Sequence, residues 1–166
     1  MPGPGVWADL GSGGGAFTLA LAELLGAGGF IYSVDRAPAV LRRQRAAVSA
    51  RFPHVRVDYV GGDFTRRLDL PPLDGVVMAN ALHFVRHKPP VLELVRSYLA
   101  PAGRLILVEY DTDRGNPWVP YPLSYRRWEA LARAAGFADV RLLATAPSSF
   151  LGRFYSSLAI VAQPAV

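Results

Sequence analysis

The sequence predicts an α/β fold in which strands and helices alternate along one domain, residues 1–166. The first observation is the stretch 6–25, where a short apolar run meets a glycine-rich turn and then an Ala/Leu-rich segment. This order is typical of a strand, a loop and a helix, and Gly26 ends the helix. The second observation is that the alternation recurs. Further apolar runs lie at 30–34, 55–60, 76–79 and 104–110.

The first two predicted helices differ in how they meet the rest of the chain. The first, about 15–25, is apolar on nearly every side, so we expect part of it to contact a partner. The second, 39–50, follows Pro38 and turns its arginines outward. The inward residues expected in this second helix are Val40, Leu41, Gln44, Ala47 and Val48.

The middle of the chain contains an edge strand, an irregular crossover and a clear helix. Strand 55–60 alternates apolar and polar residues and is expected at a sheet edge, and 65–73 is too short for a full helix. Apolar residues from Val91 to Leu99 recur at helical spacing after a proline pair. The turn 101–103 then separates this helix from the strand at 104–110.

The last third of the sequence is predicted to form a loop, a helix and a pair of strands. The loop 111–124 leaves the end of a buried strand, and Ser124 is expected to cap a helix over 125–135 that Gly136 ends. Strands are expected at 138–146 and 155–163, joined by the segment 147–154.

Composition limits the class of protein. Hydrophobic residues make up 51% of the chain and the mean hydropathy is +0.20, which excludes a disordered chain. No run approaches the ~20 apolar residues of a membrane span, and the first residues lack the features of a secretion signal. The chain has no cysteine, which excludes disulfides and zinc–cysteine sites. We therefore expect a cytoplasmic protein with no membrane association and no metal site.

The positive charge leaves two interpretations open. The net charge is +5, and all but one of the 18 basic residues are arginine, the exception being Lys88. Together with the high content of Ala, Gly and Pro, this favours the codon bias of a GC-rich genome. The alternative is an electrostatic surface for RNA, which no recognisable RNA-binding module accompanies.

The glycine-rich turn offers a floor for a nucleotide-like ligand. Glycines let the backbone reach positive φ without a Cβ between it and the ligand, and the next helix begins with unpaired N–H groups. Residues 11–16 also satisfy the G-x-G-x-x-G/A dinucleotide fingerprint. However, Asp9 lies two residues before Gly11, and a carboxylate there suits an ammonium or sulfonium and repels a pyrophosphate.

The residues from Asp9 to Gly15 resemble motif I of the class I S-adenosylmethionine (SAM)-dependent methyltransferases, in which an acidic and an apolar residue precede G-x-G-x-G. The resemblance implies a doubly wound, mostly parallel seven-stranded sheet of order 3-2-1-4-5-7-6, with the last strand antiparallel and helices on both faces. It also implies SAM as cofactor, with Asp9 holding the ammonium group directly or through water. Most members carry helices before the first strand. Here residues 1–5 leave no room for one, so we expect either an unusually open site or one that a partner chain, a second copy or a missing segment covers.

Two further acids fit the same cofactor. Asp35 follows the second strand, 24 residues after Gly11, close to the spacing of a ribose-binding carboxylate. The resemblance implies that Asp63 binds the adenine amino group beside the ring of Phe64, although Gly-Gly-Asp is also a common turn. The cofactor-binding residues expected are Asp9, Gly11, Ser12, Gly13, Gly15, Asp35, Arg36, Asp63, Phe64 and Asn80.

The acceptor side is predicted from the end of the fourth strand. Asn80-x-x-His83 resembles motif IV of small-molecule methyltransferases and lacks the D/N-P-P-Y/F tetrad of enzymes that methylate amino groups on bases or glutamine. His83 is a candidate general base and substrate residue; the alternative is a histidine that packs a loop. Trp118 and Tyr121 are candidate substrate residues in a wall or lid; the alternative is a connector whose aromatic side chains cover the core.

These observations predict SAM-dependent methyl transfer to a small-molecule acceptor, with oxygen as the first nucleophile considered and then nitrogen or carbon. Three alternatives stay open. They are an NAD-binding oxidoreductase, which Asp9 and the short chain oppose, an RNA or ribosomal methyltransferase, and a non-catalytic SAM-binding partner subunit.

Overall fold

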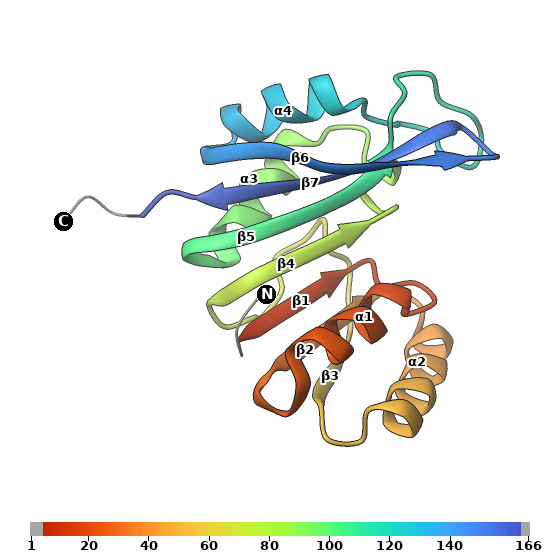
Figure 1. Ribbon diagram of the computed structural model, residues 1–166, viewed down its shortest axis with the longest axis vertical. Helices are drawn as coiled ribbons and strands as arrows, with labels where there is room; N and C mark the ends of the chain where they lie inside the picture. The colour runs from red at the N-terminus through yellow and green to blue at the C-terminus, as the bar shows by residue number, and fades with distance from the viewer. Residues whose placement is uncertain (1–4, 164–166) are drawn as a thin grey trace.

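The computed structural model describes residues 5–163 and contains one seven-stranded sheet of order β3-β2-β1-β4-β5-β7-β6 (Figure 1). The strands are β1 (Val6–Leu10), β2 (Phe30–Asp35), β3 (Arg56–Gly61), β4 (Leu73–Ala79), β5 (Leu99–Tyr110), β6 (Phe137–Ser148) and β7 (Gly152–Val161). The helices are α1 (Ala16–Leu25), α2 (Pro38–Arg51), α3 (Pro89–Tyr98) and α4 (Tyr125–Ala134), with 3-10 turns η1 (Gly26–Gly28) and η2 (Leu82–Phe84). The predicted fold class and strand order are confirmed.

The directions of the strands show at which edge of the sheet a ligand is expected to bind. Strands β1 to β5 pair in parallel, and β7 pairs antiparallel with both β5 and β6. The carboxyl ends of five strands therefore lie along one edge. In open α/β sheets, ligands bind outside these ends, where the strand order reverses. That reversal falls between β1 and β4, which are neighbours in the sheet.

The core has two layers, one on each face of the sheet, because successive side chains of a strand point to opposite faces. Trp7, Ile31 and Val77 pack with α1 and α2 on one face. Residues such as Met78 and Leu107 pack with α3 and α4 on the other face (Figure 1). The central strands are mostly apolar on both sides, as expected of parallel strands that helices cover.

Helix α1 is only partly covered. Its residues Leu21, Ala22 and Leu25 are buried, whereas Leu24 is 52% exposed. The contact with a partner that was expected for this helix stays a prediction.

Several strand boundaries differ from the predictions. The predicted turn 101–103 is built into β5, which begins at Leu99 opposite Leu73 and reaches regular pairing at Arg104 after an irregularity. Strands β6 and β7 are also longer than expected, so their connection is 149–151 and not 147–154. Pairing between neighbouring strands extended both elements beyond what alternation alone predicts.

Two side-chain predictions are wrong. Ser124 precedes α4 but makes no capping bond; its hydroxyl donates to the Oδ2 of Asp113 at 3.0 Å. The carboxylate of Asp111 accepts instead from the first helical N–H, that of Tyr125, at 2.9 Å. Ala47, expected to point inward from α2, is exposed, whereas Gln44 is buried.

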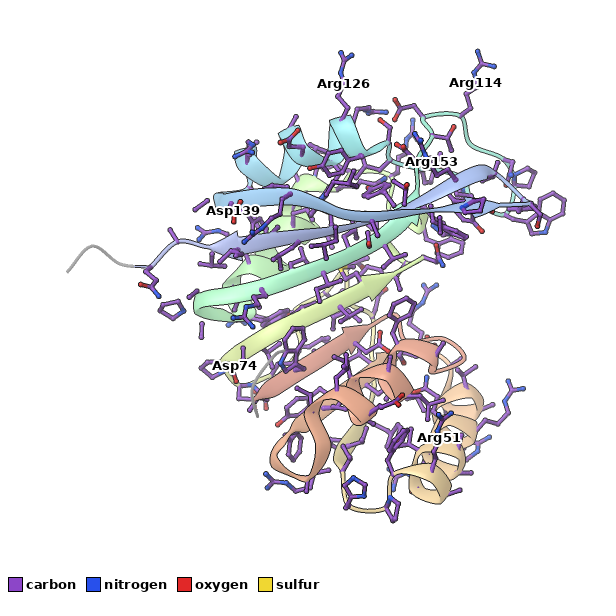
Figure 2. All side chains as sticks on the ribbon, in the orientation of Figure 1. Arg51, Asp74, Arg114, Arg126, Asp139 and Arg153 are labelled. Atoms are coloured by element: carbon purple, nitrogen blue, oxygen red, sulfur yellow. The ribbon has the colours of Figure 1, made fainter. Side chains whose placement is uncertain are left out.

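Exposed arginines occur on several elements of the chain. Arg51, Arg114 and Arg126 project outward from different elements (Figure 2). Within residues 5–163, no helix combines the length and the apolar composition that a membrane crossing requires.

The contact between β1 and β4 yields a stability prediction. A Cβ added at Gly75 would collide with the indole of Trp7, its pairing partner in β1, which is 2% exposed. We expect Gly75→Ala to lower the free energy of unfolding by about 1–3 kcal/mol, because an overpacked core must shift side chains or backbone. Urea denaturation measures this change. The control is Gly61→Ala, where a Cβ would meet nothing within 4 Å; an equal loss in both variants would contradict the packing argument.

Candidate active site

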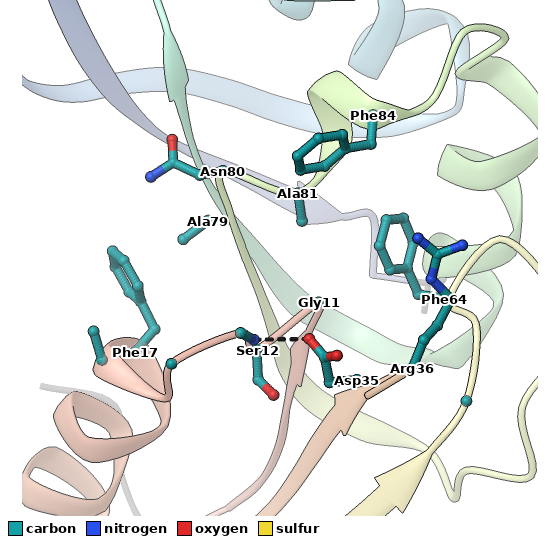
Figure 3. Close-up of a pocket in the computed structure, with 14 residues that line it drawn as sticks. Gly11, Ser12, Phe17, Asp35, Arg36, Phe64, Ala79, Asn80, Ala81 and Phe84 are labelled. Carbon is teal, nitrogen blue, oxygen red and sulfur yellow. Dashed lines mark hydrogen bonds between the residues drawn. The ribbon is translucent and has the colours of Figure 1, made fainter. Parts of the chain in front are cut away.

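The glycine loop between β1 and α1 forms the floor of a cavity of about 410 Å³ (Figure 3). This volume lies in the range of small-molecule sites. The cavity opens at the carboxyl ends of β1, β2 and β4, the place that the topology predicts. Its lining residues are Gly11, Ser12, Gly13, Gly14, Ala16, Phe17, Asp35, Arg36, Gly62, Phe64, Ala79, Asn80, Ala81 and Phe84.

The loop needs glycine for both conformation and space. Gly11, Gly13 and Gly15 have φ values of 75°, 50° and 83°, a region that other residues rarely adopt. A Cβ at Gly11 would lie 2.8 Å from the Cβ of Ala81, whereas one at Gly14 would meet nothing within 4 Å. The backbone at Gly14 therefore borders open space, and a ligand can approach it closely. The placement of the methionine portion of SAM against this loop stays a prediction.

Asp35 joins the loop to β2 and lines the cavity. Its Oδ2 accepts from the N–H of Gly13 and its Oδ1 from the N–H of Ala37, both at 2.9 Å. Each carboxylate oxygen can accept a second bond, so Asp35 keeps capacity for ribose hydroxyls. The expectation for Asp35 is compatible with this position.

A buried polar network supports the loop from below, and sequence reasoning gave two of its members, Gln44 and Ser33, no role in the site. Gln44 of α2 donates from Nε2 to the hydroxyl of Ser12 at 2.8 Å and to the carbonyl of Gly13. Ser33 donates to the Oε1 of Gln44 at 2.7 Å. A Cβ at Gly15 would lie 2.7 Å from the Cγ of Gln44, so the loop rests directly on this side chain. The sequence feature that could have identified Gln44 is its position among the apolar residues predicted to face inward from the second helix.

Asp9 belongs to the same buried layer and does not line the cavity. It is 2% exposed, and the hydroxyl of Thr18 donates to its Oδ2 at 2.7 Å. Burial raises the pKa of the Asp9 carboxyl to about 6, and the bonds from Thr18 oppose this rise. The direct bond to the cofactor expected for Asp9 stays a prediction, since the carboxylate lies behind the loop.

The expected adenine residues lie on the far side of the same opening. Phe64 and Arg36 line both the main cavity and a neighbouring one of about 320 Å³, whereas Asp63 lines only the second. Asp63 accepts from the backbone and the hydroxyl of Thr65, and these bonds lower the pKa of its carboxyl. Its adenine contact stays a prediction.

Asn80 directly follows β4 and lies at the rim of the cavity in a strained backbone conformation. Its φ is 53°, uncommon for a residue other than glycine, and its N–H donates to the carbonyl of Val108 at 2.9 Å. Asparagine tolerates this region better than most residues. The strain lets the chain leave β4 abruptly and enter η2, which contains His83.

His83 is buried against a carboxylate that the sequence analysis did not select. Its Nδ1 lies 2.7 Å from the Oε2 of Glu109, and its backbone N–H donates to the Oε1 at 3.1 Å. Glu109 is fully buried in β5. A carboxylate at Nδ1 favours the tautomer protonated there, which leaves a lone pair on Nε2. The sequence feature that could have identified Glu109 as a site residue is that it is a single acidic residue near the end of an otherwise apolar strand.

Aromatic side chains continue from His83 toward the surface. The His83 ring lies 4.4 Å from Phe84, a cavity residue, and 6.1 Å from Tyr110. Phe150 lies 6.1 Å from Tyr110 and 6.3 Å from Trp118, all measured between ring centroids. Trp118 is 71% exposed, so it does not cover the core.

The loop 111–124 contacts the His83 turn directly. The N–H of Tyr121 donates to the carbonyl of His83 at 3.0 Å. Neither Trp118 nor Tyr121 lines the cofactor cavity. Tyr121 adjoins the His83 turn, whereas the position of Trp118 and Tyr121 beside an acceptor and their contact with it stay predictions.

Comparisons with known proteins agree with this geometry. A family model described as "Methyltransferase domain" matches residues 8–105, and the chain belongs to this family. The prediction of a class I SAM-dependent methyltransferase, with SAM as cofactor, is thereby confirmed.

Two curated relatives are much longer than this chain. The highly reducing polyketide synthase aurA of Calcarisporium arbuscula is 28% identical over 115 residues, which are 57% of this chain and 5% of that protein. The reducing polyketide synthase grgA of a Penicillium species is 31% identical over 91 residues, 43% of this chain and 4% of that protein.

Solved structures share the fold at low identity. The CurJ carbon methyltransferase superposes with a TM-score of 0.80 at 19% identity and covers 98% of this chain and 50% of its own. An arsenic(III) S-adenosylmethionine methyltransferase of Chlamydomonas reinhardtii gives 0.79 at 22%, covering 98% and 66%. A SAM-dependent methyltransferase of Aquifex aeolicus gives 0.74 at 18%, covering 97% and 84%.

The buried Asp9 yields a pH prediction. Between pH about 4 and 6 the folded state retains a proton that the unfolded chain, with an ordinary Asp pKa, has released. The free energy of unfolding therefore falls as pH rises through this window and stays lower above it. We expect Asp9→Asn to raise the free energy of unfolding at pH 8 by about 2–3 kcal/mol and to flatten this slope.

Denaturation at pH 4 to 8 measures both effects. The matched control is Asp58→Asn at an exposed acid of β3, which should leave the slope in place. A less stable Asp9→Asn protein at pH 8 would show instead that the ionised carboxylate stabilises the fold.

Proposed function

We propose that this chain transfers the methyl group of SAM to an acidic carbon, such as the carbon between the two carbonyl groups of a β-keto thioester. The observation that carries the proposal is His83 held by Glu109 beside the cofactor cavity. Support also comes from similarity to polyketide synthases and to structures named as carbon methyltransferases. Carbon thus replaces oxygen as the first acceptor considered.

SAM supplies an electrophilic methyl group on a sulfonium. On this proposal Nε2 of His83 takes the proton from the acceptor carbon, and the released electron pair forms the new carbon–carbon bond as the sulfur–carbon bond breaks. Glu109 stabilises the imidazolium that results, since a carboxylate at Nδ1 gains an ion pair when the ring is protonated. The proton then passes from His83 to solvent.

Access to His83 depends on Phe84. His83 is 3% exposed, whereas the adjacent Phe84 is 59% exposed and lies against its ring. An exposed ring can change rotamer at low cost, because few contacts hold it. We infer that Phe84 turns aside to admit the acceptor and otherwise shields the base from water.

The other expectations keep the status of proposals. The acceptor is a small molecule and not RNA, since Arg36 is the one arginine among the described residues that line the main cavity. A partner chain or second copy covers the exposed side of α1, which the exposure of Leu24 supports. The protein is cytoplasmic.

Two variants test the proposed base. We expect His83→Gln and Glu109→Gln to lower the rate of methyl transfer to an acetoacetyl thioester by at least ~100-fold, the usual contribution of a general base. Both should leave SAM affinity within about twofold, because neither residue lines the cofactor cavity. Mass spectrometry of the product and calorimetry of SAM binding measure the two quantities.

His54→Gln, at an exposed histidine, is the matched control and should behave as the wild type. A His83→Gln protein with full activity would exclude the base. A wild-type chain that binds SAM and methylates no thioester would instead favour another acceptor or the non-catalytic partner subunit.

A further inference from the structure

The only lysine of the sequence, Lys88, is buried at the start of α3, and the function proposed above does not use it. Its side chain lies between two segments far apart in the chain. The ammonium donates to the carbonyl of Val85 at 2.8 Å and to the carbonyl of Tyr121 at 2.7 Å. Lys88 is 6% exposed, so this bridge forms inside the protein.

The bridge fastens the loop 111–124 beside the candidate base. Tyr121 accepts from Lys88 through its carbonyl and donates through its N–H to the carbonyl of His83. A single loop residue is therefore held on both sides by the segment from His83 to Lys88. A compact ammonium suits this place, because it can donate to two converging carbonyl oxygens, whereas a guanidinium would need a wider, planar arrangement.

Charge explains why the ammonium tolerates burial. Burial lowers the pKa of Lys88, and the negative charge of Glu109 opposes that shift, while Arg127 adds to it. Glu109 is the carboxylate that holds His83. Bonds from a charged donor to carbonyl oxygens are stronger than neutral ones and offset part of the desolvation cost.

We propose that Lys88 is a positioning residue that holds the Tyr121 segment against the His83 turn and so sets the spacing between the acceptor-side wall and the base. The role toward the acceptor rests on the proposed function. The bridge itself does not, because it can be measured without SAM or acceptor. Without the ammonium, two carbonyl groups would lack their buried donor and the loop would open more readily.

The test compares hydrogen exchange by mass spectrometry in Lys88→Met and wild type. We expect exchange in 111–124 to accelerate at least tenfold in Lys88→Met, while β1 and β4 exchange as in the wild type. Lys88→Arg keeps the charge and the donors and should restore part of the protection. With an active acceptor, Lys88→Met should raise the KM for the acceptor and leave SAM affinity unchanged.

Unchanged exchange in 111–124 would overturn the proposal, and so would an equal acceleration in all strands, which would assign Lys88 to overall stability. If Lys88→Met does not fold, Lys88→Gln is tested instead, since glutamine is smaller, neutral and has two N–H donors. We expect the same acceleration of exchange in 111–124. Failure of both variants to fold also overturns the proposal. Absence of acceptor methylation in the wild type would count against the proposed function alone.

Discussion

The attachment of the glycine loop to the end of β2 is the constraint on which the site depends. The N–H groups of Gly11 and Ser12 both donate to the carbonyl of Val34 at 2.9 Å, and that of Gly13 donates to Asp35. These bonds satisfy the loop backbone and bring the ends of β1 and β2 together. Gln44 supports the loop from below. The cofactor side is thus held by bonds within the protein itself.

Local sequence predicted much of this architecture, because the relevant residues lie close together in the chain. The Asp9–Gly15 motif located the loop, and the distance to Asp35 located the second carboxylate. The strand order came from the family resemblance, since alternation of strands and helices does not determine which strands are neighbours.

What the sequence could not predict was how distant residues pair. Glu109 follows His83 by 26 residues and meets it only because β4 and β5 are neighbours in the sheet. Lys88 and Tyr121 are separated by 33 residues and join across two loops. Ser124 occupies the capping position, but its hydroxyl donates to Asp113, and the N–H of Tyr125 at the start of the helix donates to Asp111. Such choices follow from tertiary packing, which can override local preference.

The three tryptophans of the chain occupy very different surroundings. Trp7 and Trp128 are 2% and 0% exposed, one on each face of the sheet, whereas Trp118 is 71% exposed in the loop 111–124. Indole emission shifts to shorter wavelength in apolar surroundings, so the red edge of the fluorescence spectrum belongs to Trp118. The protein therefore carries an intrinsic optical probe in the loop 111–124, and events there can be followed without an attached dye.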